Sequence, residues 1–289
     1  MRKKLIYTNS SGDSIVISDR PFVLQKISGF NNIKNNIYTS KSMGQDGETY
    51  TDSNLGVREL IINGVLYVDS RNLKQVYRRE MIKVLNPKLD GRLQYECDDF
   101  SKTIDCKVEN APVFGDESLR MQPFDITLLC PKPFFKDLDE IKADIVLWVG
   151  DFEFPLEIPQ DTGIEMGHRE PSLIVNVLNN GDVECGMRIV FKALATLTNP
   201  SLFNVNTREY IKINKGMVAG ETITITTHFG NKKIIDNLNG VASNAFMYID
   251  LGSTFLQLAV GDNLFRYNAD TGIDNLECEI YFTPQYLGV

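Results

Sequence analysis

The stretch that decides the fold of the first half of the chain is Arg58-Glu59-Leu60-Ile61-Ile62-Asn63-Gly64. Its apolar residues predict a β-strand, and the Asn-Gly dipeptide, a strong hairpin-turn signal, predicts that the strand ends in a turn at Asn63-Gly64. One amphipathic helical pattern follows within a few residues. A strand beside a single helix indicates a mainly β domain that packs one helix against its sheet.

The helix is predicted to run from Asp69 or Ser70 to Leu85. Either of the first two residues can cap its N-terminus, and Asn86-Pro87 ends it because the residue before proline avoids helical geometry. The apolar residues fall on one face, which we expect to pack on the sheet: Leu73, Val76, Tyr77, Met81, Val84 and Leu85. The other face is basic, with Arg71, Lys74, Arg78, Arg79 and Lys83. Such a face is usually solvated, and a binding role is the alternative.

Outward from this core, period-two alternation of apolar and polar residues dominates the first half. Residues 29–56 are rich in Gly, Asn, Ser, Thr and Asp and hold few apolar residues. They predict a long loop or an extended β-hairpin arm, and a connection of that length usually serves a function. Further strands are predicted at Ser14–Ile17 after a turn at Gly12-Asp13, at Arg92–Cys97 and Thr103–Glu109 around a turn at Asp98-Asp99, and at Phe124–Cys130.

The second half shows many short strands with turns between them, which is typical of a β-sandwich or jelly-roll. Pro131 and Pro133 mark a break, so we place the domain boundary at about 131–140. Strands are predicted at Ile145–Val149, Leu173–Leu178, Glu184–Leu194, Tyr210–Ile213, Thr222–Thr227, Phe255–Leu258 and Leu276–Phe282. Turns are predicted at Asn180-Gly181, Gly230-Asn231 and Gly261-Asp262-Asn263. The predicted fold is mainly β, with two domains, residues 1–135 and 136–289.

Charge is divided unevenly between these halves. Residues 1–135 carry a net charge of +2, residues 136–289 carry −10, and the whole chain carries −8. Without a concentrated basic stripe, specific nucleic-acid binding is not indicated. The longest apolar runs are strand-sized, and Thr8, Asn9 and Ser10 end the first apolar stretch before it could form a signal-peptide core. We therefore expect a protein that folds in a cytoplasm and does not bind a membrane.

The chain lacks the motifs of common catalytic sites. It has no G-x-S-x-G elbow, no G-x-x-x-x-G-K-[ST] loop and no G-x-G-x-x-G loop. Its two histidines, His168 and His228, lack metal-binding spacing, and we expect surface or half-buried roles. Acidic pairs such as Glu153 with Glu157, or Asp137 with Asp139, are expected by chance in an acidic chain and do not indicate a glycosidase. Trp148 lies within an apolar run and is predicted to be buried.

Metal and disulfide sites are equally unsupported. Residues 268–274, Asn-x-Asp-x-Gly-x-Asp, share the alternating oxygen ligands of a calcium loop but lack its closing glutamate, so a hairpin turn is expected. The five cysteines are odd in number and none forms a C-x-x-C pair: Cys97, Cys106, Cys130, Cys185 and Cys278. Cys97 and Cys106 could face each other across a hairpin, but a reducing compartment would keep them as thiols. We assign no catalytic, cofactor-binding or metal-binding residue.

Several short motifs in a fixed order resemble the distal tail proteins of long-tailed bacteriophages. In the first half they are Asp46-Gly47, the stretch 58–64, Leu85-Asn86-Pro87, Asp90-Gly91-Arg92-Leu93, Ala111-Pro112-Val113-Phe114 and Cys130-Pro131-Lys132-Pro133-Phe134-Phe135. In the second half they are the stretches 179–186, 220–225 and 258–263. The resemblance covers nearly the whole chain.

This resemblance implies an N-terminal β-sandwich with a helix and a C-terminal galectin-like β-sandwich. It implies a virion structural protein, not an enzyme, that forms a homo-hexameric ring in the baseplate at the tail tip after assembly in the host cytoplasm. The ring would join the major tail protein of the tail tube to a tail-associated, tail-fibre or receptor-binding protein, and DNA would only pass through it. A carbohydrate-binding module that contacts host cell-wall glycans is the alternative, and exposed aromatic residues clustered on the second domain would favour it.

Overall fold

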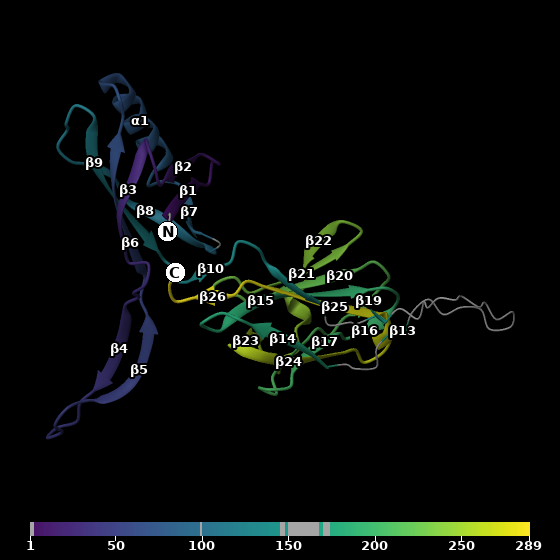
Figure 1. Cartoon of the computed structure of the whole chain (residues 1–289). Coiled ribbons are helices and arrows are strands. Elements are labelled where there is room, and N and C mark those ends of the chain that lie inside the picture. The colour runs from purple at the N-terminus through teal and green to yellow at the C-terminus, as the bar shows by residue number, and fades with distance from the viewer. Residues whose placement is uncertain (1–2, 99, 145–147, 150–167, 170–173) are drawn as a thin grey trace, which may run out of the picture. The chain divides into compact units, whose positions relative to one another are not determined.

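The computed structural model describes residues 3–98, 100–144, 148–149, 168–169 and 174–289. The chain divides into two compact units, and each is built mainly from antiparallel β-strands (Figure 1). The first unit comprises Met1–Leu138 together with Gln285–Val289, and the second comprises Asp139–Pro284. No helix among the described residues is long and apolar enough to span a membrane.

The first unit contains twelve elements in chain order. They are β1 (Lys3–Asn9), β2 (Ser14–Ile17), β3 (Phe22–Ser28), β4 (Asn35–Ser40), β5 (Thr49–Leu55), β6 (Arg58–Tyr67), α1 (Arg71–Val84), β7 (Asp90–Cys97), β8 (Phe100–Phe114), β9 (Met121–Cys130), β10 (Phe135–Lys136) and β26 (Gln285–Tyr286). The main sheet has the order β2-β1-β7-β8-β9-β6-β3, with β10 joining β8 to β26. Its two ends meet where Ser18 bonds with the backbone of Phe22 and Leu24, at 3.0 and 3.2 Å.

Helix α1 packs on this sheet with a narrower face than its apolar pattern predicts. Ser70 caps its N-terminus by accepting a hydrogen bond from the Leu73 amide, as expected. Met81 and Val84, with Leu85 at the end of the helix, enter the core. Leu73 and Val76 were expected on the same face but are exposed, because the helix contacts the sheet mainly through its C-terminal half.

Strand β6 contradicts the predicted turn at Asn63-Gly64, because it continues without interruption to Tyr67. Asn63 and Gly64 pair with Asp125 and Phe124 of β9 in the middle of the sheet. A Cβ atom at Gly64 would lie 2.8 Å from the Val23 carbonyl oxygen and would also strike the Phe124 ring. The glycine therefore serves close packing between strands and not a turn.

The predicted arm, residues 29–56, is a β-hairpin made of β4 and β5.

The elements of the second unit, in chain order, are β11 (Ile141–Asp144), β12 (Trp148–Val149), β13 (His168–Arg169), β14 (Ile174–Asn179), β15 (Cys185–Ala193), β16 (Leu197–Thr198), β17 (Ser201–Asn204), β18 (Tyr210–Lys212), β19 (Gly216–Met217), β20 (Thr222–Thr226), β21 (Lys233–Leu238), β22 (Val241–Asn244), η1 (Phe246–Tyr248), β23 (Gln257–Leu258), β24 (Gly261–Asn268), η2 (Ile273–Asn275) and β25 (Leu276–Phe282).

The second unit is a β-sandwich. One sheet has the order β11-β25-β15-β20-β21-β22 with β23 beside β15, and the other has the order β14-β24-β17-β18. Alternate residues of both sheets, such as Ile189, Ile280 and Phe265, enter one common core. The predicted turn at residues 261–263 is displaced, because β24 already begins at Gly261. Residues 145–147, part of the predicted strand Ile145–Val149, lie outside the described residues.

The chain returns to the first unit at its end, so the predicted division into residues 1–135 and 136–289 differs from the structure. Phe135 and Lys136 of β10 pair with Tyr286 and Gln285 of β26. The second unit is therefore inserted between two paired strands of the first. We call residues 285–289 the closing segment.

Deleting the closing segment should destabilise the first unit and leave the second unchanged. The deletion removes the partner strand of β10 and exposes Phe135, which is fully buried. We expect calorimetry to show a fall of about 5–10 °C in the Tm of one transition only. Leu287→Ala is the control, since it keeps the backbone of this segment. Two unchanged transitions, or a fall in the Tm of the transition that belongs to the second unit, would contradict the assignment.

Candidate functional site: the hairpin arm and its anchor

The arm, residues 31–57, is the most exposed structured part of the first unit. None of its residues is buried, although the residues on both sides of it, Phe30 and Arg58, are. Strands β4 and β5 each extend about 20 Å at roughly 3.3 Å per residue. A two-stranded hairpin is marginally stable by itself in water, so an exposed arm of this length indicates a surface that is completed by a partner.

The arm has two chemically different faces. The register pairs Asn35 with Leu55 and Ile37 with Ser53, and Tyr50 lies on the same face beyond a bulge. Ile37 and Tyr50 are 62% and 61% exposed, so this face presents apolar groups to solvent. On the other face Asn36 donates to Asn54 at 3.2 Å, and the exposed Tyr38 accepts from Asn54 through its hydroxyl at 3.3 Å. We call the face with Ile37, Tyr50 and Leu55 the apolar face of the arm.

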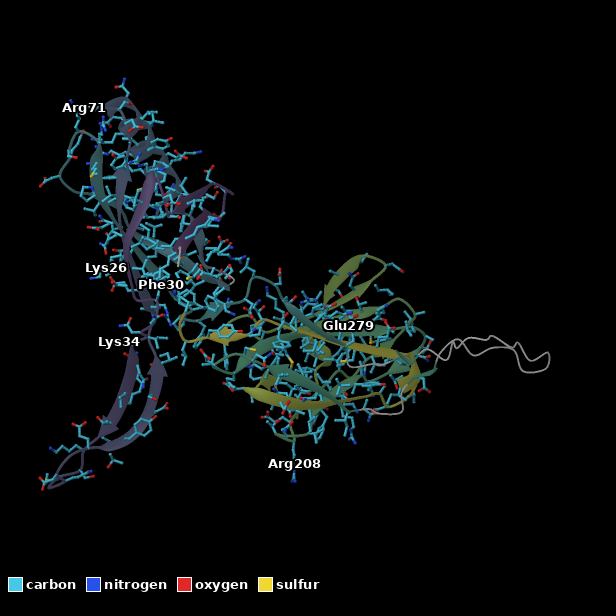
Figure 2. The ribbon with its side chains drawn as sticks, in the orientation of Figure 1. Lys26, Phe30, Lys34, Arg71, Arg208 and Glu279 are labelled. Atoms are coloured by element: carbon cyan, nitrogen blue, oxygen red, sulfur yellow. The ribbon has the colours of Figure 1, made fainter. Side chains whose placement is uncertain are left out.

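The distal part of the arm is acidic. Residues 42–53 contain Asp46, Glu48 and Asp52 and no lysine or arginine. The basic residues of the arm, Lys34 and Lys41, lie before this segment, and Figure 2 shows Lys34 near the root beside Phe30. The arm therefore presents apolar side chains along one face and negative charge around its tip.

The root of the arm is anchored by Arg58, the first residue of β6, whose exposed fraction is 2%. Its guanidinium donates hydrogen bonds to four backbone carbonyls, those of Gly29 at 2.8 Å, Phe30 at 2.9 Å, Pro133 at 2.7 Å and Leu287. It also lies over the Phe135 ring, 5.0 Å from the ring centroid. Among the described residues no carboxylate pairs with it.

Burial lowers the pKa of Arg58 from its ordinary value, yet a guanidinium stays protonated in proteins. Among the described residues the positive charge is compensated by carbonyl dipoles and by the face of the Phe135 ring. Those carbonyls belong to three segments that are distant in sequence: the entrance to the arm, the exit from β9 and the closing segment. Arg58 thus fixes the root of the arm to the frame of the first unit.

A second cluster ties down the closing segment. Lys102 forms an ion pair with Asp137, and its ammonium lies 3.6 Å from the centroid of the Tyr286 ring. The Tyr286 hydroxyl donates to Asp137 at 3.1 Å. Burial alone would lower the pKa of Lys102, but hydrogen bonds with Asp137 and Tyr286 raise it above its ordinary value. The Lys102 ammonium therefore keeps its charge at neutral pH, and the cluster has a structural role.

The basic face of α1 is only partly solvated. Lys74 was predicted on that face but is fully buried, because its ammonium reaches Glu117 at 3.2 Å and the Ser118 carbonyl. Arg78 is half-buried over the Phe114 ring at 4.7 Å. Arg79 and Lys83 remain exposed, and a shallow depression beside them is lined by the apolar Val76 and Ile82. Basic and apolar groups therefore alternate on this surface.

The second unit holds a buried charged cluster without a cleft. Lys215 forms ion pairs with Glu221 and Asp236, both nearly buried. Burial lowers the pKa of Lys215, but hydrogen bonds to Asp236 and Glu221 more than offset that effect and raise it. The Glu221 carboxylate also accepts from the Val218 amide at 2.9 Å. These contacts tie the segment before β20 to β21.

The residues considered for catalysis do not converge in the described parts of the chain. His228 and His168 lie on separate strands or turns, and the side chain of His168 is outside the described residues. Glu153 and Glu157 lie wholly outside them, as does the side chain of Trp148. The Asp137 carboxylate forms an ion pair with the Lys102 ammonium. No group of three or more His, Cys, Asp or Glu side chains that could hold a metal occurs among the described residues.

The calcium-like segment 268–274 is used internally. The Asp270 carboxylate contacts the Lys212 ammonium at 2.9 and 3.0 Å and accepts from Asn199 at 2.8 Å. These contacts lower the pKa of Asp270, with the hydrogen bond from Asn199 as the largest cause. A carboxylate paired with an ammonium is not arranged to bind a cation.

All five cysteines are free thiols, and four are buried. Cys97 and Cys106 do not face each other, because Cys97 pairs with Phe100 and Cys106 with Gly91 across the hairpin of β7 and β8. Cys106 instead lies beside Cys130 of β9, and a hydrogen bond between their side chains raises the pKa of Cys106 well above its ordinary value. The four buried thiols are therefore shielded from solvent, whereas Cys97 is only partly buried.

Comparison with known proteins identifies the family of the chain. A family model described as a phage tail protein RIFT-related domain matches residues 10–130, and one described as the C-terminal domain of a siphovirus-type tail component matches residues 180–286. The chain belongs to the distal tail protein family of long-tailed phages. Distal tail proteins are structural components of the phage tail and baseplate hub.

Solved structures show the same fold. The Dit protein (gp 19.1) of phage SPP1, described as a hub of the adsorption apparatus of phages that infect Gram-positive hosts, matches with a TM-score of 0.70 at 15% identity over 98% of this chain and 99% of its own. The baseplate of phage P2 in its activated conformation with Ca matches at 0.52 and 13% identity over 100% of both chains. The same baseplate with Sr matches at 0.51 and 12% identity, again over 100% of both. No curated protein matches the sequence.

Sequence reasoning missed the role of Arg58 in this distal tail protein, although a signal was present. Arg58, Leu60, Ile62 and Leu66 are in phase on β6, and all are buried. An arginine in phase with inward-facing apolar residues is expected to be buried, and a buried guanidinium needs hydrogen-bond acceptors inside the protein. The alternation could have indicated a buried arginine but not its acceptors, which come from residues 29–30, 133 and 287.

Replacing Arg58 should have a large effect on stability. In Arg58→Met, four carbonyls lose a charged donor, and we expect a loss of about 3–5 kcal/mol in the free energy of unfolding of the first unit. Arg58→Lys should lose less, because an ammonium keeps the charge but cannot reach all four acceptors. Chemical denaturation would measure both.

The matched control is Arg92→Met. Arg92 is exposed and pairs with the exposed Asp105 at 3.3 Å, so its loss should cost about 0–1 kcal/mol. Equal effects of the two methionine variants would contradict the anchor role of Arg58.

Proposed function

We propose that six copies of this distal tail protein form a ring that joins the tail tube to the host-adsorption apparatus. The first unit makes the ring, and its arm reaches a neighbouring copy. The observation that carries this proposal is the arm itself, which has no buried residue, one apolar face and a firmly anchored root. A ring needs a heterologous contact between two different patches, and an arm that extends beyond the globular part of its own unit can provide one of them.

In this proposal the ring lies at the tail tip below the major tail protein, after assembly in the host cytoplasm. The second unit is a galectin-like sandwich that holds the tail-associated, tail-fibre or receptor-binding protein. Its predicted charge of −10 for residues 136–289 favours a peripheral position, where water and salt reduce repulsion between copies. DNA passes through the ring without specific contacts, and no catalysis is involved.

Removing the arm should abolish the ring but not the fold. We would replace residues 31–54 by a short glycine link, which is feasible because Arg58 donates to the Phe30 carbonyl at 2.9 Å and so holds the two ends of the arm together. Light scattering of the intact protein should give six times the mass of one chain, and the variant should give the mass of one chain with an unchanged thermal transition. A hexameric variant would show that the arm is not the contact.

Sugar binding by the second unit is a second candidate, because the structure exposes an aromatic cluster there. Phe229 is 66% exposed, and Phe246 stacks on Phe255 with ring centroids 6.0 Å apart. Lys232 lies 5.0 Å from the centroid of the Phe255 ring, so this face is already partly covered. Calorimetric titration with host cell-wall glycans tests the candidate. Binding that is lost in Phe229→Ala would support it, and no binding would remove it.

A further inference from the structure

The exposed outer face of α1 carries both apolar and basic side chains. Val76 and Ile82 are 60% and 47% exposed, and they alternate with the basic Arg79 and Lys83 along one stripe of the helix. Spacings of three, four and seven residues place Val76, Arg79 and Lys83 on the same side. Among the described residues Arg79 forms no ion pair. Lys83 pairs with Asp13 at 3.3 Å and Glu80 is exposed nearby, so the surface offers Arg79 as its unpaired charge beside two exposed apolar side chains.

The arm has the opposite charge and a matching apolar surface. Its tip, residues 41–48, carries Asp46 and Glu48 against one lysine, Lys41, and its apolar face exposes Ile37 and Tyr50. Opposite charges around a contact steer association and fix its register, whereas the apolar groups supply burial. Of the exposed surfaces described in the first unit, the outer face of α1 is complementary to the arm in both respects.

The arm of one copy does not reach α1 of the same copy. Within the first unit the hairpin projects from one end and α1 lies at the other, as Figure 1 shows, and Figure 2 places Arg71, the first residue of α1, far from Lys34 at the root of the arm. Two complementary patches at opposite ends of one unit form the arrangement that a heterologous contact between identical copies requires.

We infer that the arm of one copy binds the outer face of α1 on the next copy, with Ile37 and Tyr50 against Val76 and Ile82. Asp46 and Glu48 then lie near Arg79 and Lys83. This inference rests on the proposed ring and names the surface that receives the arm. Because charge steers the contact, the ring should dissociate more readily as the salt concentration rises.

Charge reversal in the full chain tests the pairing. Asp46→Lys with Glu48→Lys places like charges together, and so does Arg79→Glu with Lys83→Glu. Each double variant should raise the concentration at which half of the chains are hexameric by about tenfold or more, measured by analytical ultracentrifugation. The four changes together should restore most of the wild-type association, because the charges are complementary again.

Matched controls reverse exposed charges elsewhere in the first unit. Lys88→Glu and Glu109→Lys change the net charge in the same directions but lie on neither patch. They should leave the association within about twofold of the wild type. The pairing is overturned if the controls weaken the ring as much as the double variants do. It is also overturned if the quadruple variant shows no recovery of association.

Crosslinking locates the contact independently of charge. The photoreactive residue benzoylphenylalanine would replace Tyr50 in a mixture of unlabelled and ¹⁵N-labelled chains. Mass spectrometry should find the crosslink between the arm of one copy and residues 71–84 of a differently labelled copy.

The failure of this inference and the failure of the proposed ring have different signatures. A hexameric wild type whose Tyr50 crosslinks elsewhere on a neighbour, or within its own copy, overturns the α1 contact and leaves the ring. A wild type that stays monomeric at every concentration overturns the ring itself.

Discussion

The burial of one guanidinium constrains the first unit more than any other interaction. A charged group removed from water must be compensated inside the protein, and Arg58 has only backbone carbonyls with which to do this. The four acceptors must therefore be held at fixed positions, which fixes the entrance to the arm, the segment after β9 and the closing segment relative to one another. The arm is long and exposed, but its direction at the root is set by this buried charge.

Local sequence patterns predicted the elements whose determinants lie close together in the chain. The helix is the best case, because Ser70 and Asn86-Pro87 define its two ends within a few residues of it. The arm was predicted from its lack of apolar residues, and the structure confirms a hairpin. The mainly β fold and its helix are likewise confirmed.

Features that depend on distant partners could not be predicted in this way. The sequence Asn63-Gly64 resembles a turn, and only the Phe124 ring and the Val23 carbonyl show why a glycine is needed in a strand. Lys74 belongs by spacing to a solvated face, and only Glu117 and Ser118, which follow 43 and 44 residues later, draw it inside. Strand β1 was missed because its inward positions include Asn9, whose amide bonds the Val84 carbonyl at the end of the helix.

The insertion of the second unit between β10 and β26 has a consequence for synthesis. A ribosome makes almost all of the first unit, then the whole sandwich, and only afterwards the strand that pairs with β10. Until residues 285–289 emerge, Arg58 lacks the Leu287 carbonyl as an acceptor, and Phe135 of β10 lacks the strand that pairs with it. The part of the chain that is made first is thus the last to be completed, so a truncated chain carries an unfinished first unit. Such a dependence on residues 285–289 favours chains that contain this segment over chains that terminate before it.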